Sequence, residues 1–187
     1  GKMDSLVIVD CQYDFIEGTL ACLHSREAVS YLIQFINTHD VKAFYTGDWH
    51  SPSNRSFQVN GGIWPVHCVA GEKGAAIDHD FSDKVIKKDN KPFEGNIFLK
   101  GKNDEIEEYS AFYGENEQGE VLKDVLSRHV YVGGIASEYC VKETVLDLLK
   151  AGHTVSLLEK GVGYVKKEDH IKTLEQLKKA GVKILKE

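Results

Sequence analysis

Cys140, Asp10 and Lys100 are the residues of this sequence whose chemistry best suits the cleavage of an amide bond. A thiol can attack a carbonyl carbon, a carboxylate can take the thiol proton and return it to a leaving amine, and an ammonium group stabilises both anions. Cys140 lies between an apolar run and a helical pattern, where unpaired backbone N–H groups and the helix dipole favour thiolate. A lone cysteine is often inert filler, but the three residues together predict hydrolysis through an acyl-enzyme.

The segment before Cys140 contains the residues of an oxyanion site. The backbone N–H groups of Ala136 and Cys140 are placed to face a developing oxyanion, and Gly133 and Gly134 give the chain a close approach to the nucleophile. The same two glycines are equally well explained by a tight turn from strand to helix. The sequence leaves both interpretations open.

A second group, Asp48, His50 and His67, has the composition of a metal site. Asp48 and His50 are two residues apart and therefore lie on one side of an extended chain. His67 belongs to the same irregular segment, residues 48–76. Two imidazoles and one carboxylate with open positions suit a divalent transition metal. We predict one divalent ion, with Zn²⁺ as the first choice and Fe²⁺ and Mn²⁺ as alternatives.

Three aromatic residues, Phe15, Trp64 and Tyr109, lie close to these motifs in the sequence. A flat aromatic ligand would stack on such side chains. Aromatic residues are also common in plain hydrophobic cores, so the pattern allows both roles. We predict that all three contribute to substrate binding.

The elements that must position these residues alternate between strands and helices. Apolar runs predict strands and period-3.6 patterns predict helices. Alternation of this kind indicates an α/β fold with three layers, in which a mostly parallel sheet carries helices on both faces. The predicted strands cover residues 6–9, 41–46, 85–86, 97–99, 129–132, 154–158 and 182–185, and the predicted helices lie around residues 28–36, 121–126, 139–150 and 168–180.

The chemically active residues all follow predicted strands. Parallel sheets bind ligands outside the carboxyl ends of their strands. Asp10 ends the first strand, Asp48 and His50 follow the second, and Lys100 and Cys140 follow later ones. We therefore expect these five residues, which are distant in sequence, to lie on one edge of the sheet.

Composition limits the classes of partner. The 187 residues are 42% hydrophobic and carry a formal net charge of −6. No linker divides the sequence, so we predict a single domain over residues 3–187, with Gly1 and Lys2 set aside as a cloning remnant. The thin spread of basic residues argues against nucleic acid or an anionic membrane as a partner. We expect a small-molecule amide instead.

Cysteine usage and hydropathy predict the compartment. The four cysteines show no C-x-x-C pair and are too few for a disulfide-stapled fold. No apolar stretch approaches the roughly 18 residues of a membrane span, and the start lacks a signal-peptide core. These features predict a cytoplasmic protein with reduced thiols, whose oligomeric state stays open.

Several motifs, in order, resemble those of the nicotinamidase and pyrazinamidase branch of the isochorismatase-like cysteine hydrolases. The matching segments are 7–15, 46–50, 64–68, 98–101, 109–112 and 134–140. The resemblance implies that Asp10, Lys100 and Cys140 form the catalytic triad and that Asp48, His50 and His67 bind the metal. It also implies that the metal holds the pyridine nitrogen of nicotinamide, that Phe15 and Trp64 flank the ring, and that the peptide bond before Ala136 is cis.

The sequence departs from the family pattern at two places. Asn54 stands where the family often carries another histidine, so either the Asn54 amide oxygen or water completes the coordination. The acidic segment 104–108 is longer than usual, and the sequence assigns it no function. The alternatives to nicotinamide hydrolysis are a related amidase that acts on a carbamoyl or ureido compound, and a non-catalytic module that binds a pyridine-like ligand.

Overall fold

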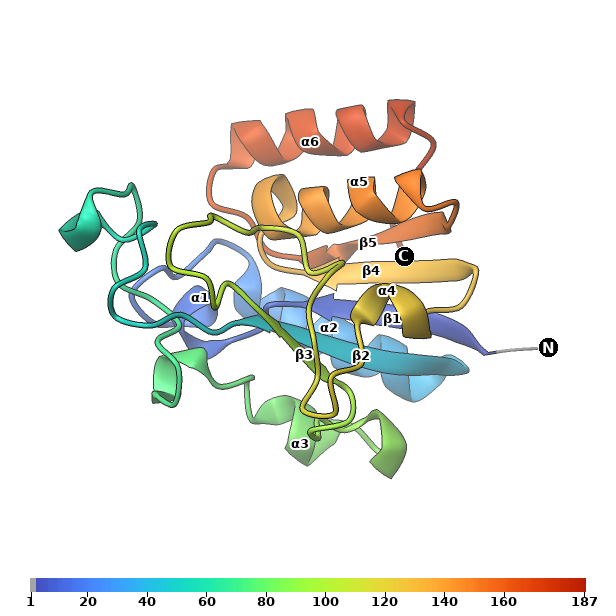
Figure 1. The fold of residues 1–187 in the computed structure, drawn as a ribbon. Coiled ribbons are helices and arrows are strands. Elements are labelled where there is room, and N and C mark those ends of the chain that lie inside the picture. Colours follow the sequence, from blue (N-terminus) through green and yellow to red (C-terminus); the bar gives the residue numbers. More distant parts are fainter. Residues whose placement is uncertain (1–2) are drawn as a thin grey trace.

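A single parallel sheet organises the protein in the computed structural model, which describes residues 3–187. The prediction for Gly1 and Lys2 lies outside the described residues. The sheet has six strands in the order β3-β2-β1-β4-β5-β6, and every neighbouring pair is parallel (Figure 1). The strands are β1 (Asp4–Val9), β2 (Val41–Asp48), β3 (Ile97–Lys100), β4 (His129–Gly134), β5 (Thr154–Val162) and β6 (Lys183–Leu185).

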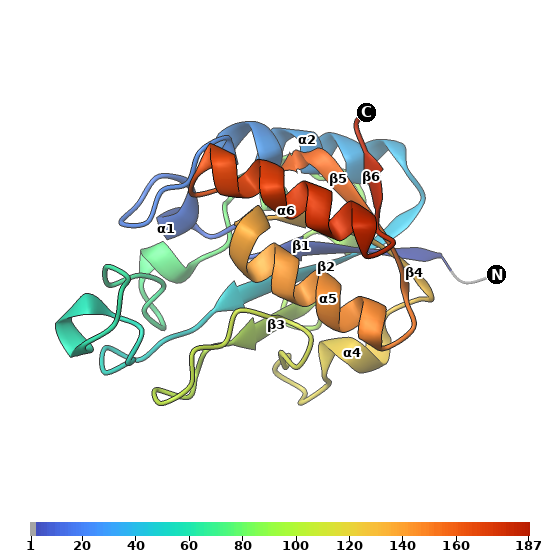
Figure 2. The same cartoon turned by 90° about the horizontal axis from the view of Figure 1, so that it is seen from above.

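Helices cover both faces of the sheet, as the sequence predicts. The long helix α2 lies on one side of β1, and α5 and α6 lie side by side on the other (Figure 2). Alternate residues of β1 pack against the helices on opposite faces of the sheet, because successive side chains of a strand point to opposite faces. The helices are α1 (Tyr13–Ile16), α2 (Ser25–Thr38), α3 (Asp80–Lys84), α4 (Leu122–Val125), α5 (Lys142–Lys150) and α6 (Lys167–Lys179).

The two hydrophobic layers meet at β1. Leu6 and Ile8 are fully buried in the cluster that includes Leu32 of α2, whereas Val7 and Val9 are buried in the cluster that includes Val145 of α5. A strand buried on both faces has a continuous apolar sequence, which is the pattern of residues 6–9.

The strand order reverses beside β1, because β2 and β3 extend the sheet to one side and β4 to β6 extend it to the other. Open parallel sheets bind their ligands at such a switch point.

Two expectations about local structure are corrected. Residues 85–86 do not form a strand: Val85 ends α3 in extended backbone and pairs with no strand of the sheet. The predicted helix over 139–150 begins instead as a π-helical turn, Ser137–Val141, and continues as α5. Hydropathy alone could not predict either feature, since a short apolar run and a widened helical turn have no distinct periodicity.

Among residues 3–187, no helix has both the length and the apolar composition needed to cross a membrane.

Candidate active site

Asp10, Lys100 and Cys140 come together at the carboxyl edge of the sheet. Lys100 Nζ lies 3.0 Å from Asp10 Oδ2, 2.5 Å from Asp48 Oδ1 and 3.5 Å from Cys140 Sγ. The Asp10 carboxylate, the Asp48 carboxylate and the Cys140 sulfur lie within 4.8 Å of one another. Three segments more than 30 residues apart therefore bring a carboxylate, an ammonium group and a thiol within reach, as the strand-end argument predicts.

Asp10 has an environment that makes its carboxylate a stronger base than usual. It follows β1 with φ of 49°, a left-handed conformation that aspartate tolerates better than most residues. Its Oδ1 accepts a hydrogen bond from Thr46 Oγ1 at 2.7 Å, whereas its Oδ2 has no partner with hydrogen-bond geometry among the described residues. Burial raises the pKa of Asp10 above its ordinary value, although the Lys100 charge opposes the shift.

The Cys140 thiol differs from the sequence-based expectation of a favoured thiolate. Its residue is 6% exposed within the π-helical turn. Burial raises the pKa of Cys140 well above the ordinary value, Lys100 lowers it, and Asp10 raises it. Desolvation disfavours the anion more than the turn and the ammonium favour it. A thiol in these surroundings needs a base beside it before it can attack.

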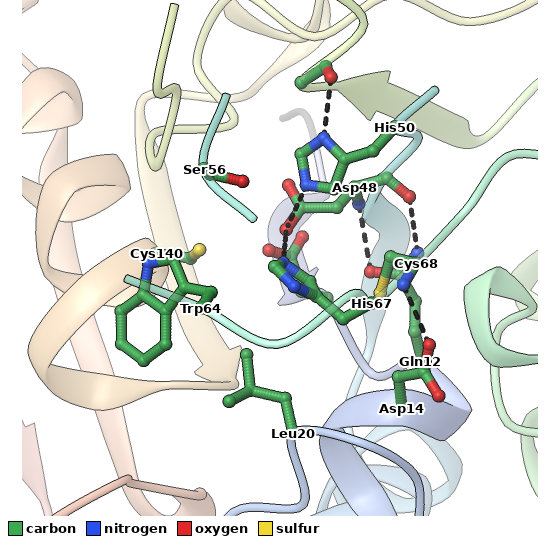
Figure 3. A network of polar contacts seen from close by, with 12 residues as sticks. Gln12, Asp14, Leu20, Asp48, His50, Ser56, Trp64, His67, Cys68 and Cys140 are labelled. Atoms are coloured by element: carbon green, nitrogen blue, oxygen red, sulfur yellow. Dashed lines mark hydrogen bonds and ion pairs between the residues drawn. The ribbon is translucent and has the colours of Figure 1, made fainter. Parts of the chain in front are cut away.

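Asp48, His50 and His67 form a second cluster on the same edge. Asp48 Oδ2 lies 3.5 Å from His50 Nε2 and 3.8 Å from His67 Nε2, and the ligand atoms of all three residues lie within 4.8 Å of one another. Figure 3 shows the Asp48 carboxylate between the two imidazole rings. Ligand atoms about 3.3 Å apart are what a tetrahedral ion with bonds near 2.0 Å requires. Two imidazoles and one carboxylate fit a divalent transition metal.

Backbone carbonyls orient both imidazoles for this task. His50 Nδ1 donates to Gly101 O at 2.7 Å, and His67 Nδ1 donates to Pro65 O at 2.8 Å. A histidine whose Nδ1–H is held in this way keeps its Nε2 lone pair for a ligand. The third ligand is Asp48. Burial alone would raise the pKa of its carboxyl group, but the Lys100 ammonium holds that pKa well below its usual range. Burial lowers the pKa of His50, but the hydrogen bond and the charge of Asp48 raise it above its ordinary value. A cation at this site therefore competes with a proton for His50 Nε2.

Gln12 and Asp14 support the site, and sequence reasoning assigned them no role. Gln12 Nε2 donates to Asp48 O at 2.8 Å, and Gln12 Oε1 accepts from Asp48 N at 2.9 Å. Asp14 Oδ2 accepts the backbone N–H of Cys68 at 2.8 Å, where the chain turns with φ of 49° immediately after His67 (Figure 3). The sequence signal that could have identified them is that both are polar residues shortly after a buried strand, at positions 12 and 14.

A narrow cavity of about 40 Å³ connects the two clusters. All the predicted substrate-binding residues line it, as do Ala136 and Asn54. Asn54 Oδ1 accepts the backbone N–H of Ser56 at 3.0 Å and Asn54 Nδ2 donates to Gly101 O at 3.3 Å, so both ends of this amide already have partners within the protein.

The lining also includes Tyr139, whose ring packs edge-on against Trp64 at 5.1 Å, and Ser56, whose buried hydroxyl has no partner among residues 3–187. The lining comprises Phe15, Leu20, Cys22, Asp48, His50, Asn54, Ser56, Trp64, His67, Ile106, Glu107, Glu108, Tyr109, Ala136, Tyr139, Cys140 and Val165.

Gly101 allows His50 its position, and a side chain there is expected to displace the imidazole. A Cβ at Gly101 would lie 2.5 Å from His50 Cε1 and 2.8 Å from His50 Nδ1, and the residue has φ of +74°. Gly101→Ala should lower metal affinity about tenfold to a hundredfold and destabilise the fold by about 1–3 kcal/mol. Metal titration and denaturant unfolding measure both effects.

Gly119→Ala is the matched control, because Gly119 has φ of +79° but no atom within 4 Å of its added Cβ. It carries the backbone strain without the contact with His50. An equal loss of metal affinity in both variants would contradict the role assigned to Gly101.

The comparison with known proteins agrees with this geometry. Residues 4–186 match the family model described as the isochorismatase domain. The protein belongs to the isochorismatase family. The member from Mycobacterium tuberculosis named nicotinamidase/pyrazinamidase is 31% identical to it over 195 residues, and the match covers 98% of both chains. The family resemblance seen in the sequence motifs is confirmed.

Solved structures of isochorismatase-family proteins share the fold. The structure of the pyrazinamidase of Pyrococcus horikoshii in complex with zinc is 32% identical, with a TM-score of 0.83 over 100% of both chains. The structure of PnC1 from L. infantum in complex with nicotinate is 28% identical, with a TM-score of 0.83 over 98% of this chain and 92% of that one. The cis peptide bond expected of the family occurs here between Ile135 and Ala136.

Proposed function

We propose that the protein is a metal-assisted cysteine amidohydrolase that converts nicotinamide, and also pyrazinamide, to the carboxylic acid and ammonia. The observation that carries the proposal is the meeting of Cys140, Asp10 and Lys100 beside the cluster of Asp48, His50 and His67. Cys140 and that cluster line the same cavity. The names of the relatives support the substrate, since they include a nicotinamidase/pyrazinamidase and a protein with bound nicotinate.

In the proposed mechanism Asp10 and Lys100 activate Cys140. Asp10 takes the thiol proton, for which its raised pKa and its place within 4.8 Å of the Cys140 sulfur suit it. The thiolate adds to the amide carbonyl while Lys100, 3.5 Å from the sulfur, stabilises the negative charge. Asp10 gives this proton to the amide nitrogen, which leaves as ammonia when the C–N bond breaks. Water then attacks the thioester with Asp10 again as the base, and the proton returns to the departing sulfur.

The backbone N–H groups of Ala136 and Cys140 are proposed to hold the oxyanion. Tyr139 N and Val141 N both donate to Ala136 O at 3.1 Å, whereas Ala136 N donates to no backbone carbonyl among the described turns and loops. Unpaired N–H groups at the nucleophile are what an oxyanion site requires. A lost donor of this kind costs about 3 kcal/mol of transition-state stabilisation in other hydrolases.

Asp48, His50 and His67 are the residues that would hold the divalent ion, for which we propose Zn²⁺. When bound, such an ion supplies a Lewis acid that anchors the ring nitrogen of the substrate. Phe15 and Trp64 are proposed to flank the ring, with Tyr109 bonded to the Trp64 indole N–H at 3.2 Å. Together these side chains would orient the carboxamide toward Cys140 and make the attack effectively intramolecular.

Ammonia release from nicotinamide by the purified protein tests the proposal, together with analysis of its metal content. We expect steady turnover with nicotinamide and pyrazinamide and one divalent ion per chain. Turnover of a ureido compound without turnover of nicotinamide would indicate the related amidase instead. Nicotinamide binding without turnover, and without a covalent adduct with nicotinaldehyde, would indicate a binding module.

Removal of the metal is expected to abolish most of the activity. Because the ring nitrogen loses its anchor, treatment with a chelator should reduce kcat/KM at least about a hundredfold. Restoring Zn²⁺, Fe²⁺ or Mn²⁺ separately, with ammonia release as the measurement, identifies the ion that serves best. Full activity after complete removal of the metal would contradict the assignment of the cluster.

We also propose the cytoplasm as the location. All four cysteines are unpaired, at positions 11, 22, 68 and 140. A nucleophilic thiol works only when it stays reduced, which a reducing compartment ensures.

A further inference from the structure

The acidic segment 104–108, which the sequence left without a function, forms one wall of the cavity. Ile106, Glu107 and Glu108 all line it. Contacts with the loop that follows β2 hold the segment in place: Ser51 Oγ donates to Asp104 Oδ1 at 2.7 Å, and Arg55 N donates to Asp104 O at 2.9 Å. The segment is therefore a fixed part of the binding site.

Glu107 presents its carboxylate at the mouth of this cavity. Its Oε1 accepts the Trp64 indole N–H at 3.0 Å and also the Tyr109 hydroxyl. Glu108 lies deeper, and its Oε1 accepts the Gly101 N–H at 2.9 Å. No lysine, arginine or histidine of residues 3–187 forms an ion pair with either glutamate. Both therefore contribute uncompensated negative charge to the wall.

The cavity lining within the described part of the chain contains three carboxylates and no lysine or arginine. Lys100 lies behind the lining with 0% of its side chain exposed, and Asp10 and Asp48 already contact its ammonium group. Arg55 uses its guanidinium to donate to Glu105 O and is not part of the lining. A ligand that carries a carboxylate thus meets no lysine or arginine of the described residues, and the two histidines of the lining, His50 and His67, face Asp48.

We infer that Glu107, with Glu108 behind it, selects uncharged amides and weakens the binding of the acid product. The inference rests on the proposed function, in which a neutral amide becomes a carboxylate inside this cavity. Because the cavity is narrow, a ligand there stays close to the wall, and like charges a few ångströms apart in a partly desolvated site repel each other strongly. Amides that carry a carboxylate, such as ureido acids, are disfavoured as substrates for the same reason.

Nicotinamide and nicotinate make a matched pair of probes, since they have nearly the same shape and differ in charge. The informative variant is Glu107→Gln, which removes the charge but keeps an oxygen that can accept the Trp64 N–H. The control is Glu105→Gln, because Glu105 belongs to the same segment but does not line the cavity. The measurements are the inhibition constant of nicotinate and the KM of nicotinamide.

We expect Glu107→Gln to lower the inhibition constant of nicotinate about threefold to tenfold at low ionic strength, with a smaller change in the KM of nicotinamide. The difference should shrink between about 20 mM and about 500 mM salt, because ions screen a charge at the mouth of the cavity. Glu105→Gln should leave both constants close to those of the natural sequence.

An unchanged inhibition constant in Glu107→Gln would overturn the inference, as would an equal fall in Glu105→Gln or an equal change for nicotinate and nicotinamide. Failure of the proposed function is a separate result, in which the natural protein releases no ammonia from nicotinamide. Calorimetric titration of nicotinate and nicotinamide into the same variants would then still measure the charge selectivity of the cavity.

Discussion

Cys140→Ala is expected to lower ammonia release from nicotinamide by a factor on the order of 10⁴ or more, because Cys140 is the thiol that Lys100 contacts. The second thiol of the cavity lining, Cys22, donates to Leu20 O instead. The protein should remain folded. The thiol lies at the cavity wall, and removing one sulfur from such a site costs about 1 kcal/mol. Circular dichroism and denaturant unfolding measure the stability, and a continuous ammonia assay measures the rate.

Binding separates the role of Cys140 in chemistry from a role in structure. The alanine variant should still bind nicotinamide in a calorimetric titration, since the metal ligands and the aromatic side chains remain. The control is Cys11→Ala, which removes a buried thiol outside the cavity lining and should retain turnover per folded molecule. Substantial ammonia release by Cys140→Ala would show that another group attacks the amide.

Lys100→Met should destabilise the protein by about 3–5 kcal/mol and reduce kcat/KM at least about a thousandfold. The ammonium group contacts two buried carboxylates, with Nζ 3.0 Å from Asp10 Oδ2 and 2.5 Å from Asp48 Oδ1. Burial would lower the pKa of Lys100, but these carboxylates raise it well above its usual value, so the side chain is charged. Its loss leaves two buried negative charges without their shared cation.

Two further variants distinguish this mechanism from loss of packing. Lys102→Met changes an exposed lysine two residues later and should alter stability by less than about 0.5 kcal/mol. Lys100→Met combined with Asp10→Asn should recover part of the stability, because one unpaired charge is gone, without recovering activity. Denaturant unfolding of chelator-treated protein gives the comparison. Equal stability of the single and the double variant would contradict the charge-based explanation.

The motifs around β1, β2 and β4 were enough to predict the main arrangement of the site. Asp10 ends a run buried on both faces, and Cys140 follows a second apolar strand, so a parallel sheet must place both at one edge. The same reasoning predicted that Asp48 and His50 would join them. Loop residues were less certain from sequence, because the path of residues 48–76 depends on contacts such as that of Asp14 with Cys68 N, which no periodicity reveals.

The two wrong predictions of local structure also arose because contacts between distant residues cannot be read from periodicity. Residues 85–86 have the composition of a strand but lie after α3, where no strand is available to pair with them. The turn that carries Cys140, Ser137–Val141, is π-helical instead of the start of an ordinary helix. Packing against neighbouring elements decides such details, and hydropathy describes only the residues themselves.

The sequence by itself determined the fold class, the family and the identity of the groups that gather at the sheet edge, because each depends on residue types and on the ends of strands. The tertiary structure alone decided the burial of the Cys140 thiol and the place of the acidic segment. Burial raises the pKa of that thiol despite the nearby ammonium, and Glu107 reaches the cavity through its contact with Trp64, 43 residues away. Both results depend on desolvation and on distances between remote segments, which exist only after the chain has folded.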